Sequence, residues 1–174
     1  EVINKTNATD LIRVTGDNPL TDPFILDQLI EKHNLSNADY TTMRFLPRGS
    51  SSEVIKSTAL KKLYLKMDPN ESQYLSIYIN DGRFFNCNVL DAPRKLFSPY
   101  LTFSVDTLEE FEDVSMVVKS KGYSSKTINY IEFAKNNQIC NISPTTKVKL
   151  SESHQINYSD YIDWQLGKKK LEEL

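Results

Sequence analysis

Two acidic residues stand where an apolar run ends and a helix is expected to begin. Asp17 follows "LIRVTG", and Asp106 follows "LTFSV" directly before Thr107. Apolar runs of this kind are typical of buried strands, and α/β sheets bind ligands at the carboxyl ends of their strands. If the two strands are neighbours, both carboxylates lie at one edge of the sheet.

Two carboxylates that converge without a basic partner repel each other unless a cation lies between them. Mg²⁺ prefers oxygen ligands and keeps several water molecules and phosphate oxygens in its coordination shell. Asp17 and Asp106 are therefore candidate catalytic residues and magnesium ligands. A phosphate-bearing substrate would be the third component of the site. The alternative is structural, because Asp before a helix is commonly a cap and Gly-Asp-Asn-Pro is a good turn sequence.

The elements that must position these acids alternate between strand and helix. Short β-type runs are expected at 11–15, 40–45, 53–55, 83–89 and 101–105. Amphipathic spacing predicts helices at 23–33, from Ser57 to Asp68-Pro69, at 72–79, at 107–122 and at 126–136. Thr107 and Glu110 form a capping-box pattern, and Asp22 is expected to cap a helix rather than act chemically. Strands separated by helices predict an α/β fold.

Composition excludes several classes of protein. The 174 residues suit one well-buried domain, and the net charge of −2 provides no basic field for nucleic acid or for an anionic membrane. Charges interrupt the apolar runs, so we expect a soluble, cytoplasmic protein without a membrane partner. Cys87 and Cys140 lack metal-ligand spacing and are expected to be buried apolar side chains. His33 is expected to be a solvated residue at a helix end.

Periodicity fades from Thr145 onward. We divide the chain into residues 1–144, the main domain portion, and 145–174, a tail or a linker to a further segment. Three aromatic residues in that tail, Tyr158, Tyr161 and Trp164, could pack against the sheet, stack on a base or join a dimer.

Three separated motifs carry a resemblance to a known family: "LIRVTGDNPLTDPFILDQLIEKH", "ADYTTMRFLPRGSSSEVI" and "LTFSVDTLEEFEDVSMVV". Together, over roughly 10–136, they resemble the later part of the cytidylyltransferase-like family. This family includes spore coat polysaccharide nucleotidyltransferases and, more distantly, deoxy-octulosonate and acylneuraminate cytidylyltransferases. The resemblance implies a three-layer nucleotide-diphospho-sugar transferase fold, with helices on both faces of the sheet, of which residues 1–144 form the C-terminal portion.

The resemblance also implies an activity, in which a cytidylyl group passes from CTP to a hydroxyl of a sugar or sugar acid and pyrophosphate leaves. Such a reaction forms nucleotide-sugars for surface polysaccharide. In the family, the acids at the positions of Asp17 and Asp106 bind the catalytic Mg²⁺. A homodimer is expected by the same resemblance.

Other positions are implied to contact substrate. Arg48, in "LPRGSSSEV", could bind a phosphate or an acceptor carboxylate, or it could be a solvated loop residue. Glu53 matches the family pattern, whereas Ser51 stands where the family has an acidic residue. Asn18, beside Asp17, shapes the turn and completes the expected substrate-binding set.

Two departures leave other functions open. Gln73 and Tyr74 replace a Glu-His pair of the family, and no Gly-rich basic loop precedes Asp10. We expect that the portion gripping the nucleotide lies outside this sequence. One alternative is a non-catalytic domain for assembly or partner binding. Another is a glycosyltransferase that uses a nucleotide-sugar and releases no pyrophosphate.

Overall fold

The computed structural model describes residues 2–67, 75–151 and 153–168. A four-stranded sheet with the order β1-β3-β2-β4 forms its centre, and β5 and β6 form a separate two-stranded sheet. The strands are β1 (Asp10–Arg13), β2 (Tyr40–Arg44), β3 (Glu53–Lys56), β4 (Cys87–Asp91), β5 (Lys147–Lys149) and β6 (Gln155–Asn157). The helices are α1 (Val2–Thr6), α2 (Pro23–Ser36), α3 (Ser57–Tyr64), α4 (Leu75–Ile79), α5 (Leu108–Lys121), α6 (Thr127–Asn137) and α7 (Tyr158–Gln165).

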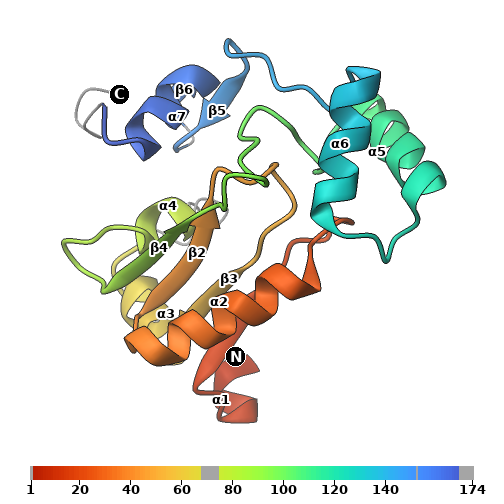
Figure 1. Ribbon diagram of the computed structural model, residues 1–174. Helices are drawn as coiled ribbons and strands as arrows, with labels where there is room; N and C mark the ends of the chain where they lie inside the picture. The colour runs from red at the N-terminus through yellow and green to blue at the C-terminus, as the bar shows by residue number, and fades with distance from the viewer. Residues whose placement is uncertain (1, 68–74, 152, 169–174) are drawn as a thin grey trace.

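Helices cover both faces of the central sheet. Strand β3 is antiparallel to β1 and β2, and β4 is parallel to β2. Because successive side chains of a strand point to opposite faces, Val54 packs with Ile25 and Leu29 of α2, whereas Ile55 packs with Leu63 of α3 and Ile79 of α4. Figure 1 shows α2 on one side of the sheet and α3 and α4 on the other. The α/β class and the helices on both faces are confirmed.

Helices α5 and α6 pack together around a second hydrophobic core beside the central sheet. The Thr107–Glu110 capping box is present, and α5 ends before Gly122. Phe103 and Tyr130 meet edge to face in this core, with ring centroids 6.0 Å apart. Full burial of an aromatic or aliphatic side chain contributes roughly 1.5–3 kcal/mol, so this cluster anchors the segment that carries Asp106.

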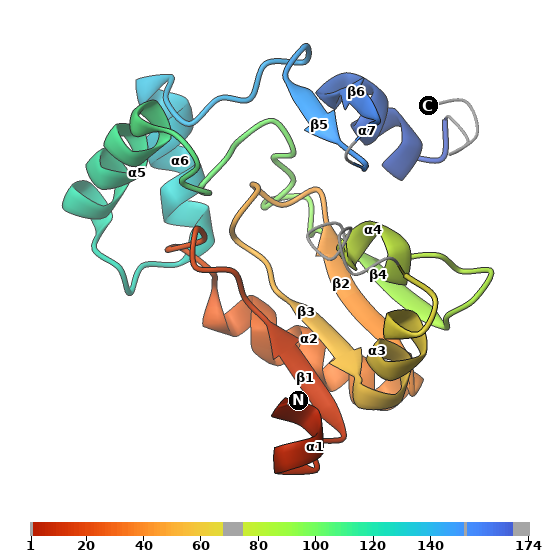
Figure 2. The same cartoon turned by 180° about the vertical axis from the view of Figure 1, so that it is seen from behind.

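The last described part of the chain folds as the β5–β6 hairpin followed by α7. In Figures 1 and 2 this unit lies beyond the carboxyl end of β2. The Tyr158 hydroxyl donates to the Pro99 carbonyl at 2.8 Å, and Arg44, at the end of β2, donates to the carbonyl of Gln165. These bonds hold α7 over the end of the sheet.

Several predicted boundaries were wrong. Residues 101–105 form single bridges, Leu101 with Asn141 and Thr102 with Arg48, and not a strand, because their backbone partners come from two different segments. The run predicted at 83–89 begins only at Cys87, since Asp81 accepts from the Arg83 amide and makes a turn there.

The helix after Ser57 ends at Tyr64. Beyond it the Leu65 amide still donates to the Lys61 carbonyl, whereas the Lys66 amide donates to the Leu63 carbonyl at three-residue spacing. The expected helix end at Asp68-Pro69, the start of the helix expected at 72–79, and the departures at Gln73 and Tyr74 lie outside the described residues.

Two residue environments also differ from expectation. His33 is 2% exposed rather than solvated, and it lies between Thr41 and Asp10. Cys140 is buried as expected, but Cys87 is only half-buried. Burial raises the pKa of the Cys140 thiol to about 12 and that of Cys87 to about 11, so both are protonated at neutral pH. No helix in the described ranges has the length and apolar character that a bilayer crossing needs.

Candidate functional site

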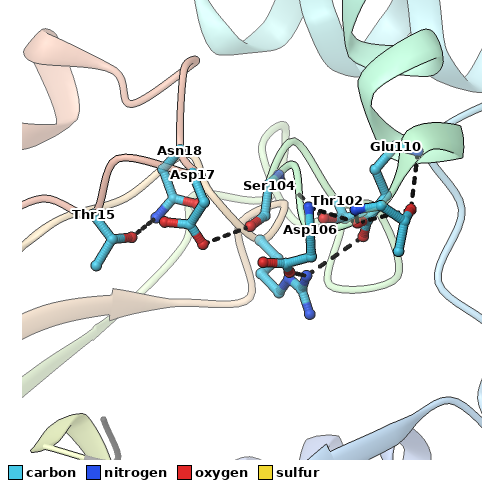
Figure 3. Close-up of polar contacts among 9 residues, drawn as sticks. Thr15, Asp17, Asn18, Thr102, Ser104, Asp106 and Glu110 are labelled. Atoms are coloured by element: carbon cyan, nitrogen blue, oxygen red, sulfur yellow. Dashed lines mark hydrogen bonds and ion pairs between the residues drawn. The ribbon is translucent and has the colours of Figure 1, made fainter.

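The loop after β1 places Asp17 against the segment that precedes α5. The Val105 amide donates to the Asp17 carbonyl at 2.8 Å, and the Ser104 hydroxyl donates to the Asp17 carboxylate at 3.2 Å. Figure 3 shows Ser104 between the two acidic side chains. The turn with Asp17 and the turn with Asp106 therefore meet at one end of the sheet.

Asp17 is ionised at neutral pH. The hydrogen bond of the Thr15 side chain lowers the pKa of Asp17 below its ordinary value, and the Ser104 hydroxyl and the charge of Arg48 act in the same direction. Burial opposes this lowering but is the smaller effect. A carboxylate held in its charged form by hydroxyl groups is a suitable ligand for a hard cation.

Asp106 has a basic partner, which corrects the expectation that the two acids converge without one. The guanidinium of Arg48 pairs with the Asp106 carboxylate, and its Nη2 lies 3.4 Å from Glu110 Oε1. Arg48 is 41% exposed and Asp106 52% exposed, so water can compete for this pair. The positive charge of Arg48 thus offsets the negative charge of Asp106, which a metal ion alone was expected to neutralise.

Gly49 brings Arg48 to this position. Its φ of +86° lies in the left-handed region, and a Cβ at Gly49 would lie 2.6 Å from the Ser104 amide nitrogen. The Arg48 amide donates to Leu101, and the Arg48 carbonyl accepts from Phe103. A glycine at position 49 is therefore required for close packing of this loop against the segment that carries Asp106.

A cavity of about 470 Å³ lies next to the acidic pair, and Asn18 and Arg48 line it, whereas neither Asp17 nor Asp106 is among its lining residues. Its walls come from the end of β1, from β2, from the loop before β3, from α4 and from α7. The lining residues are Arg13, Val14, Thr15, Asn18, Tyr40, Thr42, Met43, Arg44, Arg48, Gly49, Ser51, Ser52, Glu53, Ser76, Ile77, Asn80, Val89, Tyr161, Trp164 and Gln165. The volume falls within the range of sites for small molecules.

The structure places the remaining predicted substrate-binding residues, Glu53 and Asn18, in this wall. Glu53 accepts from Arg13 and from the Tyr40 hydroxyl, both at 2.6 Å. Burial, and then the charge of Glu53, raise the pKa of Tyr40 well above its ordinary value, so its hydroxyl stays a donor. The Asn18 amide donates to Thr15 at 2.7 Å and stabilises the turn beside Asp17.

Sequence reasoning left open whether the residues of α7 belong to this site. Tyr161, Trp164 and Gln165 of α7 line the cavity, and Arg44 links β2 to α7. Tyr158, Tyr161 and Trp164 form a chain of ring contacts with centroids 6.0 and 5.7 Å apart. Their three-residue spacing is the signal that could have predicted one helical face.

The residues of the site suit Mg²⁺, which needs few protein ligands, better than they suit a metal ion that is bound by protein side chains alone. In the described part of the chain no group of three or more His, Cys, Asp or Glu side chains could hold a metal ion. Mg²⁺ commonly takes one or two carboxylates and completes its shell with water and substrate phosphates. Asp17 and Asp106 supply such a pair, provided that Arg48 releases Asp106.

Comparison with known proteins identifies a family for this chain and two relatives. The family model described as "Cytidylyltransferase" matches residues 1–128. The spore coat polysaccharide biosynthesis protein SpsF of Bacillus subtilis (strain 168) is 30% identical over 126 residues, which are 70% of this chain and 52% of that protein. An uncharacterised protein of Methanocaldococcus jannaschii is 29% identical over 143 residues, 80% of this chain and 59% of its own length.

A solved structure has the same fold. The cytidylyltransferase from Leptospira borgpetersenii serovar Hardjo-bovis (strain JB197) matches with a TM-score of 0.67 and 24% identity. The match covers 82% of this chain and 63% of that one. The chain thus spans between half and three fifths of the length of the curated relatives it matches.

Proposed function

The chain belongs to the cytidylyltransferase family, and from this membership we propose that it takes part in Mg²⁺-dependent cytidylyl transfer. The reaction moves a cytidylyl group from CTP to a hydroxyl of a sugar or sugar acid and releases pyrophosphate, forming a nucleotide-sugar for surface polysaccharide. The observation that carries the proposal is the meeting of Asp17 with the Asp106 segment through Ser104, beside a cavity large enough for an acceptor.

The two acids have different roles in this proposal. Asp17 is ionised and accepts a hydrogen bond from Ser104, and it is the ligand that can bind Mg²⁺ without a rearrangement. Asp106 becomes the second ligand when Arg48 leaves it. A bound Mg²⁺ supplies neutralisation of charge on phosphate oxygens.

Arg48 and the cavity act on the substrates. Once free of Asp106, the Arg48 guanidinium presents a planar set of N–H donors that suits a phosphate group. The cavity beside it holds the acceptor, so that the acceptor hydroxyl lies near the acidic pair and the reactants are oriented for transfer.

Release of pyrophosphate tests the proposal. The protein is incubated with CTP, Mg²⁺ and a panel of sugars and sugar acids, and pyrophosphate is measured. Asp17→Asn and Asp106→Asn should each lower the rate by about 100-fold or more, since each removes charge that stabilises the transferring phosphates. Asp81→Asn is the matched control, because Asp81 pairs with Arg83 outside the site.

Three outcomes contradict the proposal. Full activity in Asp17→Asn or in Asp106→Asn shows that the two acids are not a pair of metal ligands. Sugar transfer from a nucleotide-sugar without pyrophosphate favours the glycosyltransferase alternative. Absence of any turnover in a folded protein that captures a partner favours the assembly role.

A further inference from the structure

We propose that Glu110 is the second partner of Arg48, to which the guanidinium passes when a cation binds the Asp106 carboxylate. Glu110 is a positioning residue in this role, because it acts on the site through Arg48. The inference deepens the proposed function and rests on it in one respect, since it takes the cation at Asp106 to be Mg²⁺. Four features of the site lead to it: the contacts of Arg48, its fixed backbone, the fixed Glu110 side chain and the charge balance.

The Arg48 side chain touches both carboxylates. Its Nη2 donates to Asp106 Oδ2 and lies 3.4 Å from Glu110 Oε1. The contact with Glu110 is at the long end of the range for a hydrogen bond, so Asp106 is the main partner in this state. A guanidinium carries five N–H donors in one plane, and a small rotation of its end exchanges one acceptor for the other.

The backbone of Arg48 is fixed, so the exchange needs movement of the side chain alone. The Arg48 amide donates to the Leu101 carbonyl at 2.9 Å, and the Arg48 carbonyl accepts from the Phe103 amide at 2.6 Å. Gly49 packs closely against the Ser104 amide directly after it. The Arg48 side chain itself is 41% exposed, and an ion pair at such a position contributes little stability, so the side chain can change partner at low cost.

The Glu110 carboxylate is held in place to receive the guanidinium. Its Oε2 accepts from the amides of Asp106 and Thr107, both at 2.9 Å, and from the Thr107 hydroxyl at 3.2 Å. These bonds belong to the capping box of α5, and they leave Oε1 as the oxygen that contacts Arg48. Because the capping box already fixes the Glu110 side chain, pairing with Arg48 costs little further conformational entropy.

The formal charges of the cluster favour the exchange. Asp17, Asp106 and Glu110 supply three negative charges and Arg48 one positive charge, so a divalent cation brings the cluster to neutrality while Arg48 stays. Two cations that share one carboxylate repel each other at short range. With Glu110 as the second partner, Arg48 and the bound cation each have an acid of their own.

The exchange connects the acidic pair to the cavity. Arg48 lines the cavity, whereas Asp106 and Glu110 are not among its described lining residues. A cation at Asp106 frees the N–H donor that Arg48 uses on that acid, and a ligand in the cavity can then accept from it. By linkage, a ligand that binds Arg48 in its second position strengthens cation binding by the same factor. The cation therefore prepares the cavity for its ligand.

A first test needs no metal ion. Asp106→Asn removes the charge of Asp106, as a bound cation neutralises it, and Arg48 should then pair with Glu110. In this background Arg48→Met should raise the unfolding equilibrium constant about threefold, as expected for loss of an exposed ion pair. Glu110→Gln should abolish this effect of Arg48→Met, and glutamine at this position retains the capping box. Urea denaturation measures the four proteins, and an equal effect of Arg48→Met with and without Glu110→Gln overturns the proposal.

A second test follows the rise of the melting temperature with added Mg²⁺. Glu110→Gln should raise the Mg²⁺ concentration for half-saturation about threefold, because the displaced guanidinium then has no acid to move to. Glu109→Gln is the matched control, since it removes one negative charge from the same first turn of α5 at an exposed position. Its effect should be clearly smaller. In Arg48→Met the two substitutions should have equal effects.

The outcomes separate this inference from the proposed function. If Asp17→Asn loses Mg²⁺ binding but Glu110→Gln and Glu109→Gln act equally in the presence of Arg48, the metal pair stands and this inference fails. If Mg²⁺ does not stabilise even the wild type, the proposed function fails and the coupling to Mg²⁺ fails with it. In that case a positive result of the urea measurement still establishes Glu110 as the second partner of Arg48.

Discussion

The guanidinium of Arg48 pairs with the carboxylate of Asp106, and Arg48, unlike Asp106, lines the cavity. One member of the acidic pair therefore has a cationic partner, whereas Asp17 is held in its charged form by the hydroxyls of Thr15 and Ser104. Because the Arg48 pair is about half-exposed, a divalent cation can compete with the guanidinium for Asp106. If Asp106 binds a cation together with Asp17, as proposed, Arg48 must first release the Asp106 carboxylate.

Arg48→Met should strengthen Mg²⁺ binding while it weakens substrate turnover. Removal of the guanidinium frees Asp106, and an exposed ion pair of this kind corresponds to about a threefold lower Mg²⁺ concentration for half-saturation. The increase of the melting temperature with added Mg²⁺ measures this value. Arg83→Met is the control, because Arg83 pairs with Asp81 away from the site. An unchanged Mg²⁺ requirement in Arg48→Met would mean that Asp106 is not a ligand.

Asp17 should make stability fall at low pH. Its folded-state pKa lies below the ordinary 3.8, so its contribution is fully present above that value and is lost as the pH falls through the folded-state pKa. Between neutral pH and pH values below 3.8, the melting temperature should fall further in the wild type than in Asp17→Asn. Parallel melting curves of the two proteins over this range check it, and equal falls contradict the lowered pKa of Asp17.

Local patterns predicted much of the fold. The Asp22-Pro23 start of α2 and the capping box of α5 involve residues two or three positions apart, so the sequence contains both partners of each interaction. The same local reasoning failed at 101–105. The apolar run there is real, but its hydrogen-bond partners, Arg48 and Cys140, come from distant segments.

The candidate site was predictable only in part. The contexts of Asp17 and Asp106 placed both at strand ends, and the structure brings their two segments together. The Arg48–Asp106 pair and the arrival of Trp164 at the cavity depend on how loops and α7 pack. The spacing of residues in the sequence does not indicate such contacts. For Trp164 three placements remained open: packing against the sheet, stacking on a base and contact in a dimer.

Asp22 should be one of the most sensitive positions for stability. One carboxylate oxygen accepts from the Phe24 amide at 2.8 Å, and the other accepts from the Thr127 hydroxyl at 2.5 Å. Asp22→Ala removes the cap of α2 and leaves the buried Thr127 without this partner, so unfolding free energy should fall by about 3 kcal/mol. Urea denaturation measures the loss.

Thr107→Ala is the comparison for Asp22. It removes the cap of α5 at an exposed position, and its cost should be about 1 kcal/mol. Equal losses in the two variants would show that the link from α2 to α6 through Asp22 adds no stability.

His33 and Thr41 should prove energetically coupled. His33 Nδ1 lies 2.8 Å from Thr41 Oγ1, and both residues are buried at the contact between α2 and β2. His33→Leu and Thr41→Val should each lower the unfolding free energy by about 2 kcal/mol, because each leaves a buried polar group without its partner. The double variant, which removes both groups, should lose about 1 kcal/mol less than the sum of the single variants.

Urea denaturation of the four proteins in this cycle measures the coupling between His33 and Thr41. Val117→Ala serves as the reference partner, since Val117 lies in the separate core of α5 and α6. Its combination with His33→Leu should be additive within about 0.5 kcal/mol. Additivity in the His33 and Thr41 cycle as well would mean that their hydrogen bond contributes nothing, and that His33 is held by packing and by Asp10 alone.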